Sequence, residues 1–143
     1  MNRMDENTPS NKKRIMVDMS ATLIHHGHTR IIEKASRFGH VIIGLTTDDE
    51  IKTKKGYCPE LSFSERKEIL KAIKYVEEVV PTPWLITEDV LRKYNVDILV
   101  HGDDNSNEVA ENKTIVFPRT EGVSSQELRI KAARSLAMLK TKI

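Results

Sequence analysis

Short runs of apolar residues alternate with longer stretches of helical spacing along most of the 143-residue chain. The runs near 14–19, 41–45, 76–80, 97–100 and 115–117 are rich in β-branched and other apolar residues, which predicts five short strands. Between them, apolar residues recur three and four positions apart, which predicts helices. Strands that alternate with helices are typical of a parallel sheet with right-handed crossovers. The pattern therefore predicts an α/β fold.

The residues at the ends of the expected elements refine this prediction. Gly39 is expected to be the C-cap of a first helix that begins near Gly27 and runs to about Phe38. Pro81 and Pro83 are expected to stop the third strand. We expect one Rossmann-like, doubly wound domain with a five-stranded parallel sheet, which binds its ligands at the carboxyl ends of the strands. The later helices are expected over 47–55 and 87–94, from Ser62 or Ser64 with Ile69, Leu70 and Ile73 on one face, and from Ser124 with the amphipathic set Leu128, Ile130, Leu136 and Leu139.

Composition and charge narrow the class of protein. Residues 1–13 are polar and lack periodicity, which predicts a disordered N-terminal tail, so one folded domain is expected over 14–143. A formal net charge of +2 disfavours a nucleic-acid-binding or polybasic membrane protein. The single cysteine, Cys58, excludes an internal disulfide, and no apolar run approaches the roughly 20 residues that span a bilayer. Since the N-terminus also lacks a signal-peptide pattern, we expect a cytoplasmic protein that binds neither nucleic acid nor a membrane.

The candidate chemistry begins directly behind the first strand. Residues 23–28 (LIHHGH) place His25 and His28 at the expected strand-to-helix junction, with Gly27 between them. Backbone N–H groups and the helix dipole at such a junction favour anions. Two imidazoles on one side of this turn suit the stabilisation of a phosphate that gains charge in a transition state. Two ordinary loop histidines or half of a zinc site are the alternatives, although a single cysteine offers zinc no CxxC partner.

Two short motifs carry a resemblance to a known family. Residues 25–28 (HHGH) resemble the HxGH signature of the nucleotidyltransferase superfamily, and residues 119–125 (RTEGVSS) resemble the RTEGhS(S/T) signature of its CTP-using cytidylyltransferase branch. The motifs stand in the family's order, and the resemblance covers about residues 14–135. It implies transfer of CMP from CTP to a small phosphomonoester or phosphonate, with release of pyrophosphate. It also implies Mg²⁺ held mainly through the CTP phosphates, no metal site made by the protein, and a homodimer.

The resemblance also implies a role for individual residues. His25 and His28 are expected to hydrogen-bond the α- and β-phosphates of CTP, so that positioning and electrostatics carry the catalysis. Lys55 and Arg119 are the implied cations on the triphosphate. The implied contacts to the acceptor are Thr22, Arg66 and Trp84. The implied nucleotide-binding positions are Met19, Ser20, Ala21, Gly27, His101, Gly102, Asp103, Thr120, Gly122, Ser124 and Ser125.

Some of these residues have simpler interpretations. His26 fills the variable position of the first motif, and simple exposure explains it equally well. Lys55 has lysines one and three positions before it, so a solvated charge is its alternative, and Asp103 beside a glycine could be an ordinary turn residue. A serine before a helix, such as Ser124, is usually an N-cap, which is itself a natural phosphate cradle. For Trp84, core or dimer packing is as good an explanation as contact with an ammonium group of the acceptor.

One loop departs from the family pattern, and it leaves the acceptor open. The family's GxFD before the histidines is replaced here by residues 19–22 (MSAT). In choline-type relatives that Asp helps recognise a cationic head group, so its absence weakens phosphocholine as the acceptor. Glycerol phosphate, an aminoalkyl or hydroxyalkyl phosphonate, and another small phosphomonoester all stay open. An ATP-using adenylyltransferase of the same fold is disfavoured by the RTEG segment, and a non-catalytic nucleotide-binding module is the remaining alternative.

Overall fold

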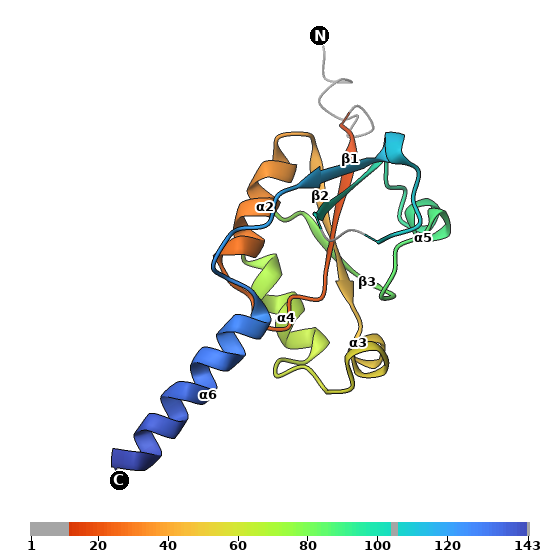
Figure 1. Cartoon of the computed structure of the whole chain (residues 1–143). Coiled ribbons are helices and arrows are strands. Elements are labelled where there is room, and N and C mark those ends of the chain that lie inside the picture. Colours follow the sequence, from red (N-terminus) through yellow and green to blue (C-terminus); the bar gives the residue numbers. More distant parts are fainter. Residues whose placement is uncertain (1–11, 104–105, 143) are drawn as a thin grey trace.

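The fold is built on one five-stranded sheet in which the neighbouring strands are parallel. A computed structural model describes residues 12–103 and 106–142 (Figure 1). The strand order is β3-β2-β1-β4-β5, so the chain reverses its progress across the sheet after β3. The predicted α/β, doubly wound fold with five parallel strands is confirmed. The strands are β1 (Arg14–Met19), β2 (His40–Thr46), β3 (Glu78–Thr82), β4 (Ile98–Gly102) and β5 (Thr114–Phe117).

Helices connect the strands, and short polar side chains begin several of them. At the start of α4 the Ser62 hydroxyl accepts a hydrogen bond from the N–H of Glu65, whose carboxylate accepts one from the N–H of Ser62. Thr47 and Thr87 cap α3 and α5 through their hydroxyls. The helices are α2 (His26–Ser36), α3 (Asp48–Lys55), α4 (Phe63–Lys71), α5 (Glu88–Lys93) and α6 (Ser125–Lys142), with a 3₁₀ helix, η2 (Glu111–Lys113), before β5.

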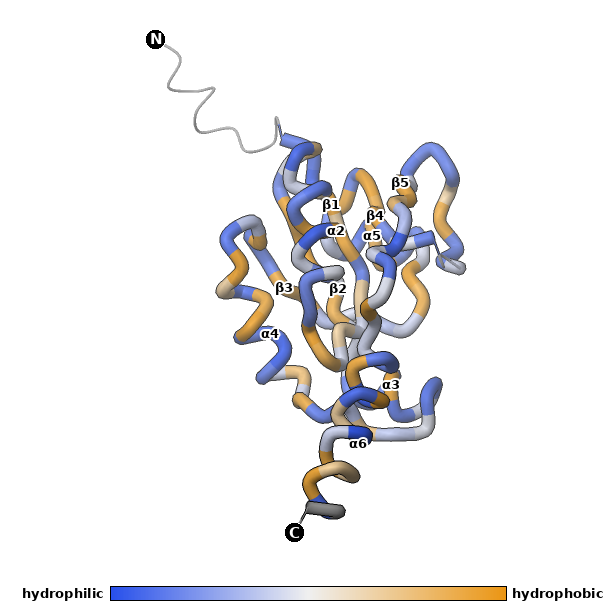
Figure 2. The backbone as a smooth tube through the Cα atoms, turned by 60° about the vertical axis from the view of Figure 1, so that its left-hand side comes forward, coloured by the Kyte–Doolittle hydropathy of each residue, from blue (hydrophilic) through white to orange (hydrophobic). Residues whose placement is uncertain are grey.

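Alternate residues of the strands face opposite sides of the sheet, and helices cover both sides. On one side Ile15 and Val17 of β1 belong to a buried cluster that includes Leu70 of α4. Met16, between them, faces the other side and packs in a second cluster with Leu91 of α5. The central strands are largely orange in Figure 2, whereas the helices mix blue and orange. Burial of both faces explains the continuous apolar runs in these strands.

The end of α2 differs from the prediction. Arg37 is the C-cap residue, so the prediction that Gly39 caps a helix running to Phe38 is wrong. Gly39 instead allows two segments to approach, because a Cβ atom there would lie 2.2 Å from the backbone oxygen of Lys13. That oxygen accepts a hydrogen bond from the N–H of His40 at 2.8 Å, where β2 begins. The glycine is therefore required by the junction between β1 and β2.

Replacing Gly39 with alanine is expected to lower the free energy of unfolding by about 3 kcal/mol. The new methyl group would overlap the Lys13 carbonyl, which is backbone and cannot rotate away. Gly56→Ala is the matched control, because Gly56 also has a positive φ, +82°, but a Cβ there would meet nothing within 4 Å. Urea denaturation should show a loss of about 1 kcal/mol for the control. Equal losses in the two variants would show that the close contact is unimportant.

The third strand and the helix before it also differ from the prediction. β3 includes Pro81, so the prediction that this proline stops the strand is wrong. Because β3 is an edge strand, the missing N–H of Pro81 removes no hydrogen bond from the ladder with β2. α4 ends before Ile73, and Ile69, predicted on the same face as the buried Leu70, is 43% exposed. Besides Leu70, Arg66 is the buried residue of α4.

The predictions for the two ends of the chain have different outcomes. The predicted disordered tail, 1–13, lies outside the described residues except for Lys12 and Lys13. α6 begins where predicted, but Ile130, Leu136 and Leu139 are exposed, so its amphipathic set is not buried as a core face. Figure 1 shows the reason, since α6 extends away from the body of the protein. Within residues 12–103 and 106–142, no helix is both long and apolar enough to cross a bilayer.

Candidate active site

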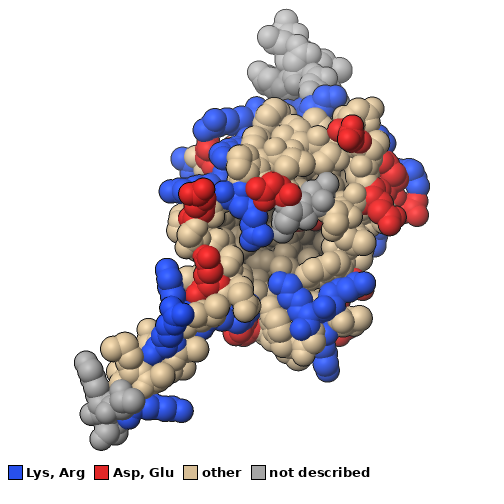
Figure 3. All heavy atoms as spheres, viewed as in Figure 1, with Lys and Arg blue, Asp and Glu red and all other residues tan. Residues whose placement is uncertain are grey.

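A pocket of about 500 Å³ opens at the carboxyl ends of the central strands, where the strand order reverses. Its wall combines the ends of β1 and β4 with the first turns of α2 and α6 and the last residue of α3. Figure 3 shows the hollow with Lys and Arg side chains on both sides of it. Ligands of open α/β sheets bind at this position, as the sequence predicts here.

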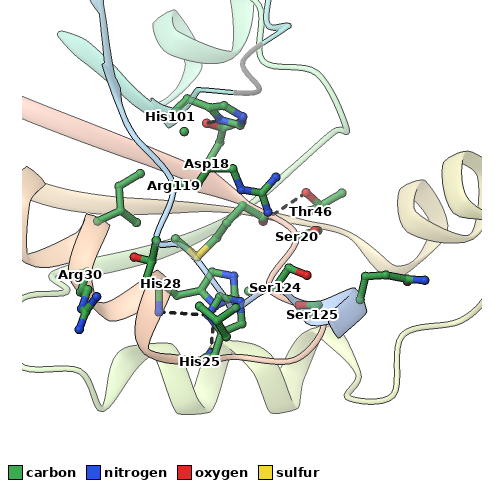
Figure 4. Close-up of a pocket in the computed structure, with 18 of the residues that line it drawn as sticks. Asp18, Ser20, His25, His28, Arg30, Thr46, His101, Arg119, Ser124 and Ser125 are labelled. Carbon is green, nitrogen blue, oxygen red and sulfur yellow. Dashed lines mark hydrogen bonds and ion pairs between the residues drawn. The ribbon is translucent and has the colours of Figure 1, made fainter. Parts of the chain in front are cut away.

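Two histidines of the pocket cap the N-terminus of α2. His25 is the N-cap residue, and its Nδ1 accepts a hydrogen bond from the N–H of Gly27 at 3.1 Å. Nδ1 of His28 accepts one from the backbone N–H of His25, also at 3.1 Å. The two ring centroids are 4.0 Å apart, and Figure 4 shows the rings together at one end of the labelled set. The two histidine side chains that cap α2 therefore also line the pocket.

These hydrogen bonds fix the protonation of both rings. Because each Nδ1 is an acceptor, the proton of a neutral ring sits on Nε2, which can donate to a ligand. Burial, together with the charges of His25 and Arg119, lowers the pKa of His28 to about 3. Burial, together with His26 and Arg119, also lowers the pKa of His25. Both rings are therefore neutral donors at neutral pH.

The low pKa of His28 predicts a loss of stability in mild acid. The unfolded chain binds a proton there with a pKa of 6.5, whereas the folded ring stays neutral down to about pH 3. In this pH window the unfolded state therefore binds more protons than the folded state. The free energy of unfolding consequently decreases as the pH is lowered. When the pH is lowered from 7 to 5, the free energy of unfolding measured by urea denaturation should fall by about 2 kcal/mol more in the wild type than in His28→Asn. An equal fall in both proteins would contradict a buried neutral His28.

The first turn of α6 forms another side of the pocket. The Oγ of Ser124 accepts a hydrogen bond from the N–H of Glu127 at 3.0 Å, so this serine is an N-cap. The Ser125 hydroxyl joins the turn to the histidine loop, because it accepts from the N–H of Leu23 at 3.2 Å and donates to its carbonyl at 3.0 Å. Arg119 lies on the same wall. A helix N-terminus with a nearby guanidinium is suited to bind phosphate.

A third set of polar side chains lies where β1 and β4 end. Its central residue, Asp18, was not predicted from the sequence. Oδ1 of the buried Asp18 is 2.5 Å from Nδ1 of His101, and its Oδ2 accepts a hydrogen bond from Asn107 at 3.0 Å. Figure 4 shows Asp18 and His101 at the opposite end of the labelled set from the histidine pair. The only signal in the sequence is one carboxylate within the apolar run of β1.

Arg66 is not at the pocket wall, although the sequence predicts that it reaches the acceptor's phosphate. Its side chain is fully buried, and all three guanidinium nitrogens already donate. The carbonyl oxygens of Leu61, Ser20 and Thr46 accept at 3.0, 2.6 and 3.0 Å, and Oδ1 of Asp48 accepts at 2.6 Å. The prediction is wrong because the Arg66 guanidinium is buried. Its hydrogen bonds connect the loop after β1, the end of β2 and the start of α3.

Three other predicted residues also lie off the wall. Thr22 is buried, and its Oγ1 accepts a hydrogen bond from Arg129 of α6 at 2.7 Å. Asp103 is exposed in the turn after β4, and Gly122 occupies a turn with a φ of +80°. The remaining predicted residues do line the pocket: Met19, Ser20, Ala21, His25, Gly27, His28, Lys55, Trp84, His101, Gly102, Arg119, Thr120, Ser124 and Ser125.

The pocket also has cationic residues that sequence reasoning missed. Arg30 and Lys34 of α2 lie on its wall. They stand three and seven positions after Gly27, so the helical period could have placed them on the same face. Lys55 is on the wall as predicted, with its ammonium 5.6 Å from the centroid of the Trp84 ring. Exposed His26 stays outside the wall.

Comparison with known proteins gives consistent matches. The cytidylyltransferase-like family model matches residues 20–135. Ethanolamine-phosphate cytidylyltransferase of Dictyostelium discoideum is 36% identical over 135 residues, which cover 85% of this chain but 37% of that protein. The chain thus spans about a third of the length of the ethanolamine-phosphate relatives, 37% and 31% in the slime mould and the mouse.

Bacterial relatives match over most of their length. Glycerol-3-phosphate cytidylyltransferase of Staphylococcus aureus is 34% identical over 125 residues, which cover 82% of this chain and 92% of that protein. Among solved structures, a lipopolysaccharide core biosynthesis protein of Thermoplasma volcanium superposes with a TM-score of 0.65 at 14% identity, covering 76% of this chain and 98% of that one. This last match supports the fold alone.

Proposed function

This chain belongs to the cytidylyltransferase-like family, and we propose that it transfers CMP from CTP to a small phosphomonoester or phosphonate. The products are a CDP-alcohol or a CMP-phosphonate, together with pyrophosphate. The observation that carries the proposal is the pair of neutral imidazoles of His25 and His28, held with their Nε2–H groups as donors beside the N-terminus of α6. The relatives named for glycerol-3-phosphate and ethanolamine-phosphate cytidylyltransferase activity support the same reaction class.

The proposed mechanism is a direct in-line displacement. A phosphate or phosphonate oxygen of the acceptor attacks the α-phosphorus of CTP, and a new P–O bond forms. The bond from the α-phosphorus to the bridging oxygen breaks, and its electrons leave with pyrophosphate. The Nε2–H groups of His25 and His28 donate to the phosphate oxygens as they gain charge, and Arg119 and Lys55 offset the charge of the triphosphate. No side chain needs to act as a nucleophile.

We propose that CTP enters as its magnesium complex, so that the metal is part of the substrate. Among the residues that the structure describes, no group of three or more His, Cys, Asp or Glu side chains could hold a metal ion. Asp18, the one described carboxylate on the pocket wall, already accepts two hydrogen bonds. These residues do not fit a resident Mg²⁺ site, whereas Mg²⁺ commonly binds through substrate phosphates. The steps above therefore rest on side chains alone.

Two further properties are proposals: the first rests on the family resemblance and the second on the single cysteine, which suits a reducing compartment. We propose that the protein is a homodimer and that it works in the cytoplasm. Light scattering after size-exclusion chromatography would test the first, with a mass of about twice the 16.3 kDa chain expected.

Pyrophosphate release is the direct test of the proposed activity. The purified chain would be assayed with CTP, Mg²⁺ and a panel of small phosphates and phosphonates, with ATP in place of CTP as the parallel reaction. Turnover with CTP and one panel member is the expected result. Turnover with ATP instead would favour the adenylyltransferase alternative. CTP binding without release of pyrophosphate from any member would favour a non-catalytic nucleotide-binding module.

A further inference from the structure

Arg129 lies on the second turn of α6, close to where that helix leaves the body of the protein. The first turn is fixed in place, because the Ser125 hydroxyl hydrogen-bonds both backbone groups of Leu23. Residues four positions apart lie on the same face of a helix, so Arg129 is also directed to the loop after β1. Its side chain is 20% exposed. The proposed mechanism gives this arginine no part.

The guanidinium of Arg129 joins two loops that are far apart in the sequence. Its Nη2 donates a hydrogen bond to Oγ1 of Thr22 in the loop after β1, at 2.7 Å. Nη2 and Nε also donate to the two carboxylate oxygens of Glu60, at 2.7 and 2.6 Å, which lowers the pKa of that carboxyl. The guanidinium carbon lies 4.7 Å from the centroid of the Tyr57 ring, within the range of a cation–π contact.

The two loops differ in how firmly the rest of the protein holds them. Thr22 is fully buried. None of residues 56–61, all of which the structure describes, is buried, and segments with few buried contacts open easily. Arg66 holds the end of this loop through the carbonyl of Leu61. Arg129 therefore connects the middle of a weakly buried loop to a fixed point of the fold.

The same loop directly follows a cation of the pocket. Lys55 is the last residue of α3 and lies on the pocket wall, two positions before Tyr57. Its side chain is exposed, and its ammonium is 5.6 Å from the centroid of the Trp84 ring. A lysine has a flexible four-carbon stem, so its charge acts at a defined place only where the backbone that carries it is held. The position of this ammonium therefore depends on the loop after α3.

We infer that Arg129 is a positioning residue for the triphosphate, which fixes the loop after α3 and thereby holds Lys55 at the pocket. The inference rests on the proposed cytidylyl transfer, in which Lys55 offsets the charge of the CTP phosphates. Arg129 itself lies off the pocket wall, so it acts through Lys55 and not by touching the nucleotide. Its partners Glu60 and Thr22 stand 69 and 107 positions away in the sequence, which hides this role from any local pattern.

Titration calorimetry with CTP and with CMP, each with Mg²⁺, tests this role. Arg129→Met is expected to raise the dissociation constant of CTP about tenfold and to leave that of CMP within about twofold of the wild type. CMP lacks two of the three phosphates whose charge Lys55 offsets. Arg134→Met is the matched control, because Arg134 is an exposed arginine farther along α6. Equal weakening of CTP and CMP binding would indicate a general distortion of the pocket and overturn the inference.

A double-mutant cycle tests whether Arg129 acts through Lys55. Arg129→Met and Lys55→Met are each expected to weaken CTP binding about tenfold, and the double variant to bind within about twofold of Lys55→Met alone. Independent effects would instead multiply, to about a hundredfold, and that result would overturn the inference.

A milder variant covers the case in which Arg129→Met does not fold. Glu60→Gln removes the charge of the ion pair but leaves the hydrogen bond between Arg129 and Thr22 in place. It is expected to raise the dissociation constant of CTP about threefold and to leave that of CMP unchanged. CTP binding equal to that of the wild type would contradict a role for this ion pair.

The single cysteine gives a measurement that needs no ligand. Cys58 is exposed and lies between Tyr57 and Glu60, so a nitroxide attached to its thiol reports the mobility of the loop. Electron paramagnetic resonance should show a more mobile label in Arg129→Met than in the wild type, with Arg134→Met like the wild type. Equal mobility in the three proteins would overturn the inference.

These outcomes separate the inference from the proposed function. A wild-type protein that does not bind CTP would overturn the proposed function itself. A wild-type protein that binds CTP no more tightly than Arg129→Met does would overturn the inference and leave cytidylyl transfer standing.

Discussion

Replacing His28 with asparagine is expected to lower kcat for pyrophosphate release by about a hundredfold to a thousandfold. Asparagine places an acceptor near the position of Nδ1, so the hydrogen bond from the N–H of His25 that starts α2 can persist. It lacks a donor at the position of Nε2, the group that donates to the phosphate in the proposed mechanism. The substitution should therefore lower kcat and leave the fold unchanged.

Three measurements make this test specific. Initial-rate kinetics give kcat, circular dichroism checks the fold, and calorimetry measures CTP binding. His26→Asn is the matched control, because His26 is an exposed histidine of the same motif, and its rate should stay within about twofold of the wild type. A His28→Asn protein that folds, binds CTP and turns over like the wild type would refute the role of this imidazole.

Arg66→Met is expected to lower the free energy of unfolding by about 3–5 kcal/mol. The substitution removes four hydrogen bonds and leaves three backbone carbonyls and a carboxylate without their shared donor. Because two of those carbonyls belong to Ser20 and Thr46 on the pocket wall, activity should fall as well in whatever fraction remains folded.

The control for this variant is Arg37→Met. Arg37 pairs with Glu33 one helical turn away on the surface, and its side chain is 69% exposed. Its loss should cost less than about 1 kcal/mol, since exposed ion pairs contribute little. Urea denaturation at neutral pH compares the two. Similar midpoints for both variants would mean that the buried guanidinium is dispensable.

The fold was predictable because its signal is local. Buried strands such as 41–45 are continuous apolar runs, and helix starts such as Ser62 are visible as capping sequences. Errors arose where distant segments decide the outcome. Gly39 is required by the carbonyl of Lys13, and Pro81 is tolerated because no strand of the described residues pairs with the outer side of β3. Neither fact can be read from the residues nearby in the sequence.

The candidate site shows the same division. His25, His28 and Ser124 were predictable, because chemistry and helix capping coincide in short motifs. Arg66 was not, because an arginine at the start of a helix reads as an exposed charge until the carbonyls that surround it are known. Asp18 was also hidden, since its partners His101 and Asn107 lie more than 80 positions away in the sequence.

The proline in β3 has a consequence for the behaviour of the protein in concentrated solution. An edge strand presents unpaired backbone groups, to which a strand of another molecule can add and begin an aggregate. At Pro81 this edge has no N–H to offer, and its carbonyl already accepts a hydrogen bond from the Tyr94 hydroxyl at 2.8 Å. A strand that docked there would forgo both bonds at that residue, so one side of the sheet is a poor template for growth into an intermolecular sheet.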